Sequence, residues 1–141
     1  MQPKLIKGNC YTDARGSLKY NNDFNATAIK RVYIIENANC GIQRGWQGHK
    51  IEQRWFSALT GSFEILLLKV DDWNCPSQDL IPIKFEIKAI EFDVVYIPSG
   101  YISCIQAISE NSKLLVMADY ALGEIKDEYR YSLEQFNCTN K

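Results

Sequence analysis

Histidine is nearly absent from this chain of 141 residues, which contains only His49. Imidazole is the side chain whose ordinary pKa places its titration closest to neutral pH. Any acid–base chemistry near pH 7 is therefore expected in the stretch from Cys40 to Lys50, between a predicted turn and a predicted strand. The alternative is a histidine without a catalytic role, which is the commoner case in proteins.

An excess of charge of either sign is also lacking. Sixteen Lys and Arg residues face 17 Asp and Glu residues, which gives a formal net charge of −1. This balance argues against a nucleic acid or a membrane surface as partner. Residues 1–8 lack the apolar run of a signal peptide, and no later segment is apolar enough to span a membrane. We therefore expect a cytoplasmic protein.

Paired cysteines are missing as well. The five cysteines are odd in number, and no Cys-x-x-Cys pair occurs among them. This pattern excludes a zinc knuckle and a regular disulfide framework.

Short apolar runs rich in Val, Ile, Tyr and Phe dominate the chain, and they are separated by clusters of Gly, Pro, Asn and Asp. This pattern predicts an all-β domain, a sandwich or barrel, that occupies residues 1–141 as a single unit. Strands are expected at residues 29–35, 55–59, 63–70, 83–90, 94–97, 101–108 and 113–120.

Three connecting segments carry further expectations. Thr60-Gly61-Ser62 predicts a hairpin between the strands on either side of it. Residues 71–82 are expected to form an exposed loop, and residues 125–136 a short C-terminal helix.

Two motifs together resemble the cupin superfamily of jelly-roll β-barrels. Gly41, Gln47, Gly48, His49 and Gly61 follow the spacing of the first cupin motif, which carries His-x-His between glycines. Pro98-Ser99-Gly100 supplies the turn of the second motif, with Ser103 at the position of its histidine.

The resemblance allows the metal question to be judged from ligand chemistry. A cupin metal site uses three histidines and a carboxylate, because borderline cations prefer imidazole nitrogens. Here Gln47 and Ser103 replace two of the histidines, and Gln53 or Arg54 stands at the carboxylate position. We therefore expect no tightly bound metal and no other cofactor.

A narrower resemblance covers almost the whole chain. Arg44-Gly45-Trp46-Gln47-Gly48-His49-Lys50 resembles the central motif of the sugar-nucleotide 3,4-ketoisomerases, also called WxcM-like proteins. Residues 15–18, 29–34, 60–63, 96–98 and 115–120 resemble the same family. The resemblance implies a metal-independent homodimer that acts on a dTDP-linked 4-keto-6-deoxyhexose in surface-polysaccharide biosynthesis.

The chain departs from the family at one of its two catalytic histidines. Gln47 stands at the first of them, so that only His49 is carried over as the acid–base residue. Glutamine forms hydrogen bonds but does not carry a proton at pH 7. Proton abstraction at C3, next to the ketone, needs one base, whereas moving the ketone from C4 to C3 needs further proton transfers. Inversion at C3 therefore fits the residues better than ketoisomerisation.

The remaining site residues follow from the motif and its neighbours. We expect Tyr101, or else Tyr33 or Tyr96, to be the proton donor. Glu52 is close enough in sequence to orient the imidazole. Arginine forks suit a pyrophosphate, and an aromatic ring beside the motif shapes the pocket. The predicted substrate-binding residues are Arg44, Gln47, Arg31, Tyr33, Trp46, Lys50 and Ser103.

A second class of function stays open at this point. Loss of the histidine at position 47 is also compatible with a catalytically silent cupin that binds a sugar nucleotide or a partner enzyme. An open pocket with a perturbed histidine and convergent tyrosines would favour the enzyme, and a collapsed or tryptophan-filled barrel would favour the binding module.

Overall fold

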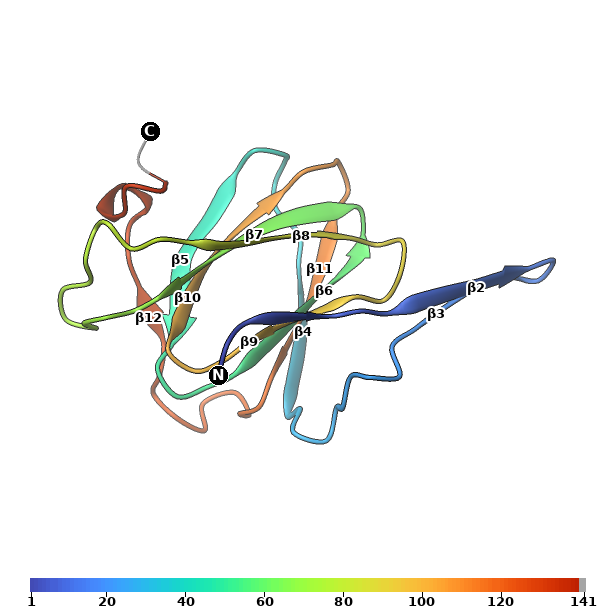
Figure 1. The fold of residues 1–141 in the computed structure, drawn as a ribbon, viewed down its shortest axis with the longest axis horizontal. Coiled ribbons are helices and arrows are strands. Elements are labelled where there is room, and N and C mark those ends of the chain that lie inside the picture. The colour runs from blue at the N-terminus through green and yellow to red at the C-terminus, as the bar shows by residue number, and fades with distance from the viewer. Residues whose placement is uncertain (140–141) are drawn as a thin grey trace.

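The computed structural model describes residues 1–139 and contains two antiparallel five-stranded sheets that face each other (Figure 1). The first sheet has the order β1 (Lys4–Ile6), β9 (Val94–Ile97), β6 (Arg54–Thr60), β11 (Lys113–Ala118) and β4 (Arg31–Ile35). The second has the order β12 (Tyr129–Arg130), β5 (Gln43–His49), β10 (Tyr101–Ala107), β7 (Ser62–Lys69) and β8 (Ile83–Lys88). The all-β prediction is confirmed, and the barrel takes the form of two open sheets rather than one closed sheet.

A separate hairpin of β2 (Asn9–Asp13) and β3 (Gly16–Tyr20) extends away from the two sheets (Figure 1). Gly16, with a φ of 130°, makes its tight turn, a backbone conformation that favours glycine. Tyr11 and Leu18 lie exposed on this arm, with 58% and 62% of their surface accessible. These strands could not be predicted from the sequence because nearly all of their residues are exposed on both faces, so that no apolar pattern marks them.

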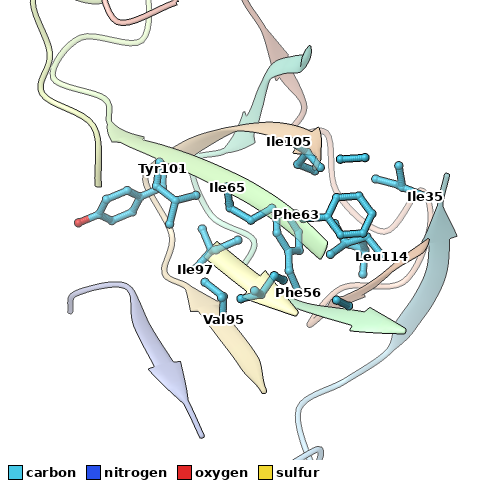
Figure 2. Close-up of a cluster of buried hydrophobic side chains, with 14 residues drawn as sticks. Ile35, Phe56, Phe63, Ile65, Val95, Ile97, Tyr101, Ile105 and Leu114 are labelled. Atoms are coloured by element: carbon cyan, nitrogen blue, oxygen red, sulfur yellow. The ribbon is translucent and has the colours of Figure 1, made fainter. Parts of the chain in front are cut away.

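The main hydrophobic core lies between the two sheets (Figure 2). Alternation along β7 points Phe63, Ile65 and Leu67 inward, and all three are fully buried. They pack against Phe56 of β6 and Leu114 of β11 from the opposite sheet. Apolar side chains with a period of two are what a strand needs in order to bury one face, so these strands were predictable from sequence.

The predicted hairpin around Gly61 is wrong. β6 and β7 do follow one another with one residue between them, but β6 pairs with β9 and β11, whereas β7 pairs with β8 and β10. Gly61, with a φ of 70°, therefore turns the chain from one sheet into the other. Ser112 Oγ lies 2.0 Å from where a Cβ would be, so this corner also has no room for a side chain.

The C-terminal region also differs from the prediction. Residues 125–136 contain the short strand β12 and a single 3-10 turn, η1 (Leu133–Gln135), instead of a helix. Backbone hydrogen bonds between Tyr131 and Trp46 in both directions hold this region to the edge of β5. Pairing with an open strand edge satisfies the backbone groups that a helix would have satisfied internally. Residues 71–82 form an irregular loop, as predicted.

No helix in residues 1–139 has the length and apolar character required to cross a membrane.

Candidate active site

A cleft of about 810 Å³ opens between β4 of one sheet and β5 of the other. Residues 121–123 and 125–130 form its third wall. A small pocket of about 30 Å³ continues from the cleft toward the core. The side chains with hydrogen-bonding or charged groups in the cleft are Arg31, Tyr33, Arg44, Gln47, His49, Glu52, Arg54, Lys126, Asp127, Glu128, Tyr129 and Arg130.

Pairing of β5 with β10 brings the two sequence motifs together. His49 lies opposite Tyr101, and Gln47 lies opposite Ser103. Arg44 lies opposite Ile105, so that three residues of β5 span the same length as two of β10. This bulge places Arg44 on the inner face together with Gln47 and His49, although strict alternation would turn it outward.

His49 is buried at the last position of β5, with 9% of its surface accessible. Its Nδ1 lies 2.8 Å from the carbonyl oxygen of Asp127 and 3.2 Å from a carboxylate oxygen of Glu52. Both neighbours are acceptors, so Nδ1 carries the proton and donates it. The other ring nitrogen, Nε2, is then unprotonated and able to act as a base.

The surroundings of His49 favour its neutral form. Burial lowers its pKa below the ordinary value of 6.5, and the positive charge of Arg54 lowers it further. Glu52 and Asp127 oppose this shift without reversing it. The imidazole is therefore neutral at pH 7, the state that a general base requires.

A buried chain of polar groups connects His49 to the opposite sheet. Arg54 donates two hydrogen bonds to Oε2 of Glu52, from Nε at 2.9 Å and from Nη2 at 2.6 Å. Its Nη1 donates to the hydroxyl of Tyr33. The ion pair is buried on both sides, with 6% of Glu52 and 7% of Arg54 accessible. Tyr33 is thereby presented to the cleft with a positive charge behind its hydroxyl.

Asp127 fixes the loop that follows His49. Its carboxylate accepts backbone N–H bonds from Lys50 at 3.0 Å, Ile51 at 2.8 Å and Glu52 at 2.7 Å. Its carbonyl oxygen accepts the bond from His49. One residue therefore holds both the imidazole and the loop that carries Glu52.

Tyr101 stands at the boundary between the core and the cleft. Its ring packs in the main core, and Figure 2 shows its hydroxyl directed away from the other labelled side chains. It lines the small pocket together with Tyr33, His49 and Ser103. Burial raises the pKa of the Tyr101 hydroxyl, which therefore stays protonated at neutral pH.

Most of the predicted site residues meet at this one place. Arg31 and Arg44 line the cleft, and the guanidinium of Arg31 lies 4.6 Å from the ring centre of Tyr33. Gln47 and Tyr33 line both the cleft and the small pocket, and the side-chain hydroxyl of Ser103 lies 3.4 Å from the carbonyl oxygen of Gln47.

Three predicted positions lie elsewhere. Trp46 points to the other face of the sheet, where it is 99% buried against Phe136 and donates its indole N–H to Thr139. Lys50 is exposed and lines neither pocket, because the chain leaves β5 at His49. Tyr96 directs its hydroxyl to Gln53, outside the cleft. Alternation along a strand put Trp46 on the wrong face for a substrate.

The C-terminal wall was missed by the sequence analysis. Asp127, Glu128 and Arg130 belong to a stretch that the pattern predicted as a helix, and no local motif marks them. Gln47 donates to Oε1 of Glu128 at 2.5 Å, and Arg130 donates to the same oxygen from Nε at 3.1 Å and from Nη2 at 2.8 Å. The only available signal was the clustering of charged residues after Gly123.

The residues in 1–139 include no group of three or more His, Cys, Asp or Glu side chains arranged to hold a metal ion. The two carboxylates beside His49 already have partners: Glu52 accepts hydrogen bonds from Arg54, and Asp127 accepts them from backbone N–H groups.

Solved structures with a similar fold come from sugar-nucleotide enzymes. QdtA, a sugar 3,4-ketoisomerase from Thermoanaerobacterium thermosaccharolyticum in complex with TDP, is 25% identical, with a TM-score of 0.70 over 97% of this chain and 93% of that chain. A variant of QdtA with the same identity and coverage holds TDP-4-keto-6-deoxyglucose.

Two further structures share the fold at lower identity. A 3,4-ketoisomerase from Helicobacter canadensis is 24% identical, with a TM-score of 0.66 over 100% of this chain and 99% of that chain. The rmlC epimerase of Mycobacterium tuberculosis is 14% identical, with a TM-score of 0.69 over 91% of this chain and 68% of that chain.

Comparison with curated protein sequences gives no match. The profile of the family described as "FdtA: WxcM-like, C-terminal" matches residues 1–141, the whole of the sequence. The chain therefore belongs to the WxcM-like, C-terminal family.

Proposed function

We propose that this protein is an isomerase or epimerase of a dTDP-linked 4-keto-6-deoxyhexose, and that His49 removes the proton from C3 of the sugar. The observation that carries the proposal is the state of His49. It is a buried, neutral imidazole whose Nδ1 donates to Asp127 and whose Nε2 is a base at the wall of an 810 Å³ cleft. Pockets that bind small molecules commonly measure about 300–1,000 Å³, and this cleft falls within that range.

The groups around His49 suit the chemistry of a ketone. Loss of the C3 proton leaves a carbanion that delocalises onto the C4 oxygen as an enolate. The Tyr33 hydroxyl, which accepts a hydrogen bond from Arg54, is a donor suited to that oxygen. Tyr101 is the candidate proton donor on the side of the small pocket. Its protonated state at neutral pH supports this assignment.

The positive charges of the cleft support a nucleotide diphosphate as the binding handle. Arg31 and Arg44 lie on the two sheets that form the cleft. Guanidinium groups bind pyrophosphate through paired oxygens. Gln47 and Ser103 are proposed to contact the sugar. QdtA, which is 25% identical over nearly the whole of both chains, was crystallised with TDP and with a TDP-linked keto sugar.

We further propose that residues 1–141 act as one cupin-type jelly-roll unit within a homodimer. The arm of β2 and β3 exposes Tyr11 and Leu18, and the edge strand β4 exposes Val32 and Ile34. Apolar side chains on a projecting arm and on an open strand edge suit a second copy of the chain. The cytoplasmic location stays a prediction.

A catalytically silent binding module is the second candidate, and Gln47 is the observation that favours it. An amide at this position removes a proton carrier from the family's motif. The open cleft and the neutral His49 weigh against this candidate, because a binding module has no need of a buried base.

Proton NMR of dTDP-4-keto-6-deoxyglucose in deuterated water tests the proposal. The wild type should introduce deuterium at C3, and the product spectrum separates inversion at C3 from ketoisomerisation. His49→Asn should exchange at least about 100-fold more slowly, because it lacks a general base. Lys50→Ala, next in sequence but outside the cleft, is the control and should exchange normally. If the wild type binds dTDP, as a rise in melting temperature would report, but exchanges no deuterium, the binding module is correct.

A further inference from the structure

Gln47 stands where the family motif has a histidine, and other side chains of the cleft lie close enough to take over the role of that histidine. If the proposed function is correct, the reaction needs a proton carrier where the family motif has its first histidine. Ketoisomerisation requires the hydrogen on C3 to be replaced by one on C4, and the hydrogen on O3 by one on O4. His49 accounts for the transfer between the two carbons, because one imidazole accepts a proton from C3 and returns it to C4. A second group is needed for the transfer between the two oxygens.

Three carboxylates line the cleft, and they differ in how far their oxygens are already engaged. Glu52 is buried and paired with Arg54. Asp127 accepts three backbone N–H bonds, which occupy both of its oxygens. Glu128 accepts its three bonds, from Gln47 and Arg130, on Oε1 alone. Glu52 also keeps one free oxygen, because its contacts with Arg54 and His49 all use Oε2, but only 7% of its side chain is accessible, against 51% for Glu128. Among the carboxylates of this cleft, Glu128 is therefore the accessible one with an oxygen left for substrate.

Gln47 and Arg130 hold Glu128 where a proton carrier is missing. The Gln47 side chain stands on the inner face of β5, two residues before His49, and its amide donates to Glu128 at 2.5 Å. Arg130, which pairs with Gln47 across β5 and β12, anchors the same oxygen from the other side. The carboxylate is thus attached to the side chain that replaces the histidine of the family motif.

Its protonation state suits the role of an acceptor. Hydrogen bonding from Arg130 lowers the pKa of Glu128, and the positive charges of Arg130 and Arg54 act in the same direction. The carboxylate is therefore ionised at neutral pH and starts the reaction ready to accept a proton.

We propose that Glu128 is a second proton carrier of this site, held by Gln47 and Arg130, and that it makes the enzyme a 3,4-ketoisomerase. The C3–H bond breaks, its proton goes to Nε2 of His49, and its electron pair forms the C3=C4 bond as the C4 carbonyl pair moves to O4. Glu128 takes the proton of O3 and delivers it to O4. The electrons of O3 then form the new C3 carbonyl as C4 takes the proton back from His49. Both residues end in their starting states, and no co-reactant is used.

The test follows dTDP-4-keto-6-deoxyglucose in deuterated water by NMR, with exchange at C3 and formation of the 3-keto sugar measured separately. Glu128→Gln should still exchange deuterium at C3, because His49 is intact. It should form the 3-keto product at least about 100-fold more slowly than the wild type. Gln47→His introduced into Glu128→Gln should restore product formation, because the added imidazole carries the second proton.

Glu124→Gln is the matched control, since Glu124 lies on the same segment, is exposed and does not line the cleft. It should behave as the wild type. Melting temperature and dTDP binding, measured for each variant, report whether the fold and the cleft are intact.

The possible contrary results separate a failure of the Glu128 proposal from a failure of the proposed function. Product formation by Glu128→Gln at the wild-type rate would overturn the role of Glu128 and leave the proposed function standing. A wild type that exchanges at C3 but yields only the C3-inverted sugar would do the same. Loss of both exchange and product in a folded, dTDP-binding Glu128→Gln would show a positioning role instead. Absence of exchange in a wild type that binds dTDP would overturn the proposed function itself.

Discussion

The space between the two sheets has an apolar half and a charged half, and each half contains buried side chains. In the first half Phe63, Ile65 and Leu114 are fully buried in the main core (Figure 2). In the second half His49 and Arg54 are 9% and 7% accessible. Burial alone therefore does not distinguish the core from the site.

The two halves differ in how their side chains are satisfied. The core gains stability from the removal of apolar surface from water, which needs no particular partner. The charged half has partners at every step, from His49 to Asp127, from Arg54 to Glu52 and from Arg54 to Tyr33. Buried charges are costly unless they are paired, and their pairing seldom adds more than it costs. The comparison indicates that the apolar half maintains the fold and that the charged half is kept for chemistry.

The strongest test of this division removes a ring from the apolar half. Phe63→Ala should lower the free energy of unfolding by about 3–5 kcal/mol, because a fully buried aromatic side chain leaves a cavity. Urea denaturation measures this loss. Activity per folded molecule should stay at the wild-type level, since Phe63 lines neither pocket. A loss of kcat in the folded variant would show that the two halves are coupled.

A smaller effect is expected at Asp127, which anchors the loop beside His49. Asp127→Asn replaces one acceptor oxygen by an amide that faces backbone N–H groups, which should cost about 1–3 kcal/mol of unfolding free energy. It should also lower kcat by about 10- to 100-fold with little change in KM, because the imidazole is displaced.

Asp119→Asn is the matched control for this variant. Asp119 accepts the backbone N–H of Gln53 at 2.8 Å and its side-chain amide at 3.0 Å, outside the cleft. A comparable loss of stability without a change in kcat is expected. If both variants lose kcat alike, Asp127 has only a structural role.

The smallest effect is a shift in pH dependence. Because burial and Arg54 lower the pKa of His49, the acid limb of kcat/KM should lie below 6.5. Glu52→Gln removes a charge that raises this pKa and should move the limb to still lower pH. Profiles of kcat/KM against pH for the wild type and the variant measure the pH of the acid limb in each. An acid limb at higher pH in Glu52→Gln would contradict the inference that Glu52 raises the pKa of His49.

The same shift has a consequence for stability. A histidine whose pKa is lowered by folding contributes its stabilising effect fully above its unfolded pKa of 6.5, and this contribution is lost as the pH falls through the folded pKa. His49→Asn should therefore flatten the decline of the melting temperature between neutral and mildly acid pH.

The sequence was most informative where the pattern of apolar residues is local. The predicted strand at 94–97 matches β9, and those at 83–90, 101–108 and 113–120 differ from β8, β10 and β11 only at their C-terminal ends. A strand that buries one or both faces has apolar residues at the buried positions. The spacing and composition of its own residues are therefore enough to predict it. The motif around His49 was likewise readable, because family resemblance and the single imidazole point to the same residue.

Pairing between strands could not be read in this way. A glycine turn such as Gly61 looks the same whether it closes a hairpin or turns the chain into a second sheet. The partner of a strand edge is chosen by the whole fold, and β5 itself was hidden because a bulge interrupts its alternation.

By itself, then, the sequence determined the all-β class, most strand positions and the family, and it singled out the residue that we propose as the base. Tertiary structure alone decided that Trp46 is buried on the face of its sheet opposite the cleft and that Arg54 pairs with Glu52. It also decided that Asp127 and Glu128 join a site about 80 residues away in the chain. The physical reason is that a residue's environment is made by strands paired across long sequence separations. Hydrogen bonds and burial of that kind leave no periodic trace in the segment that provides them.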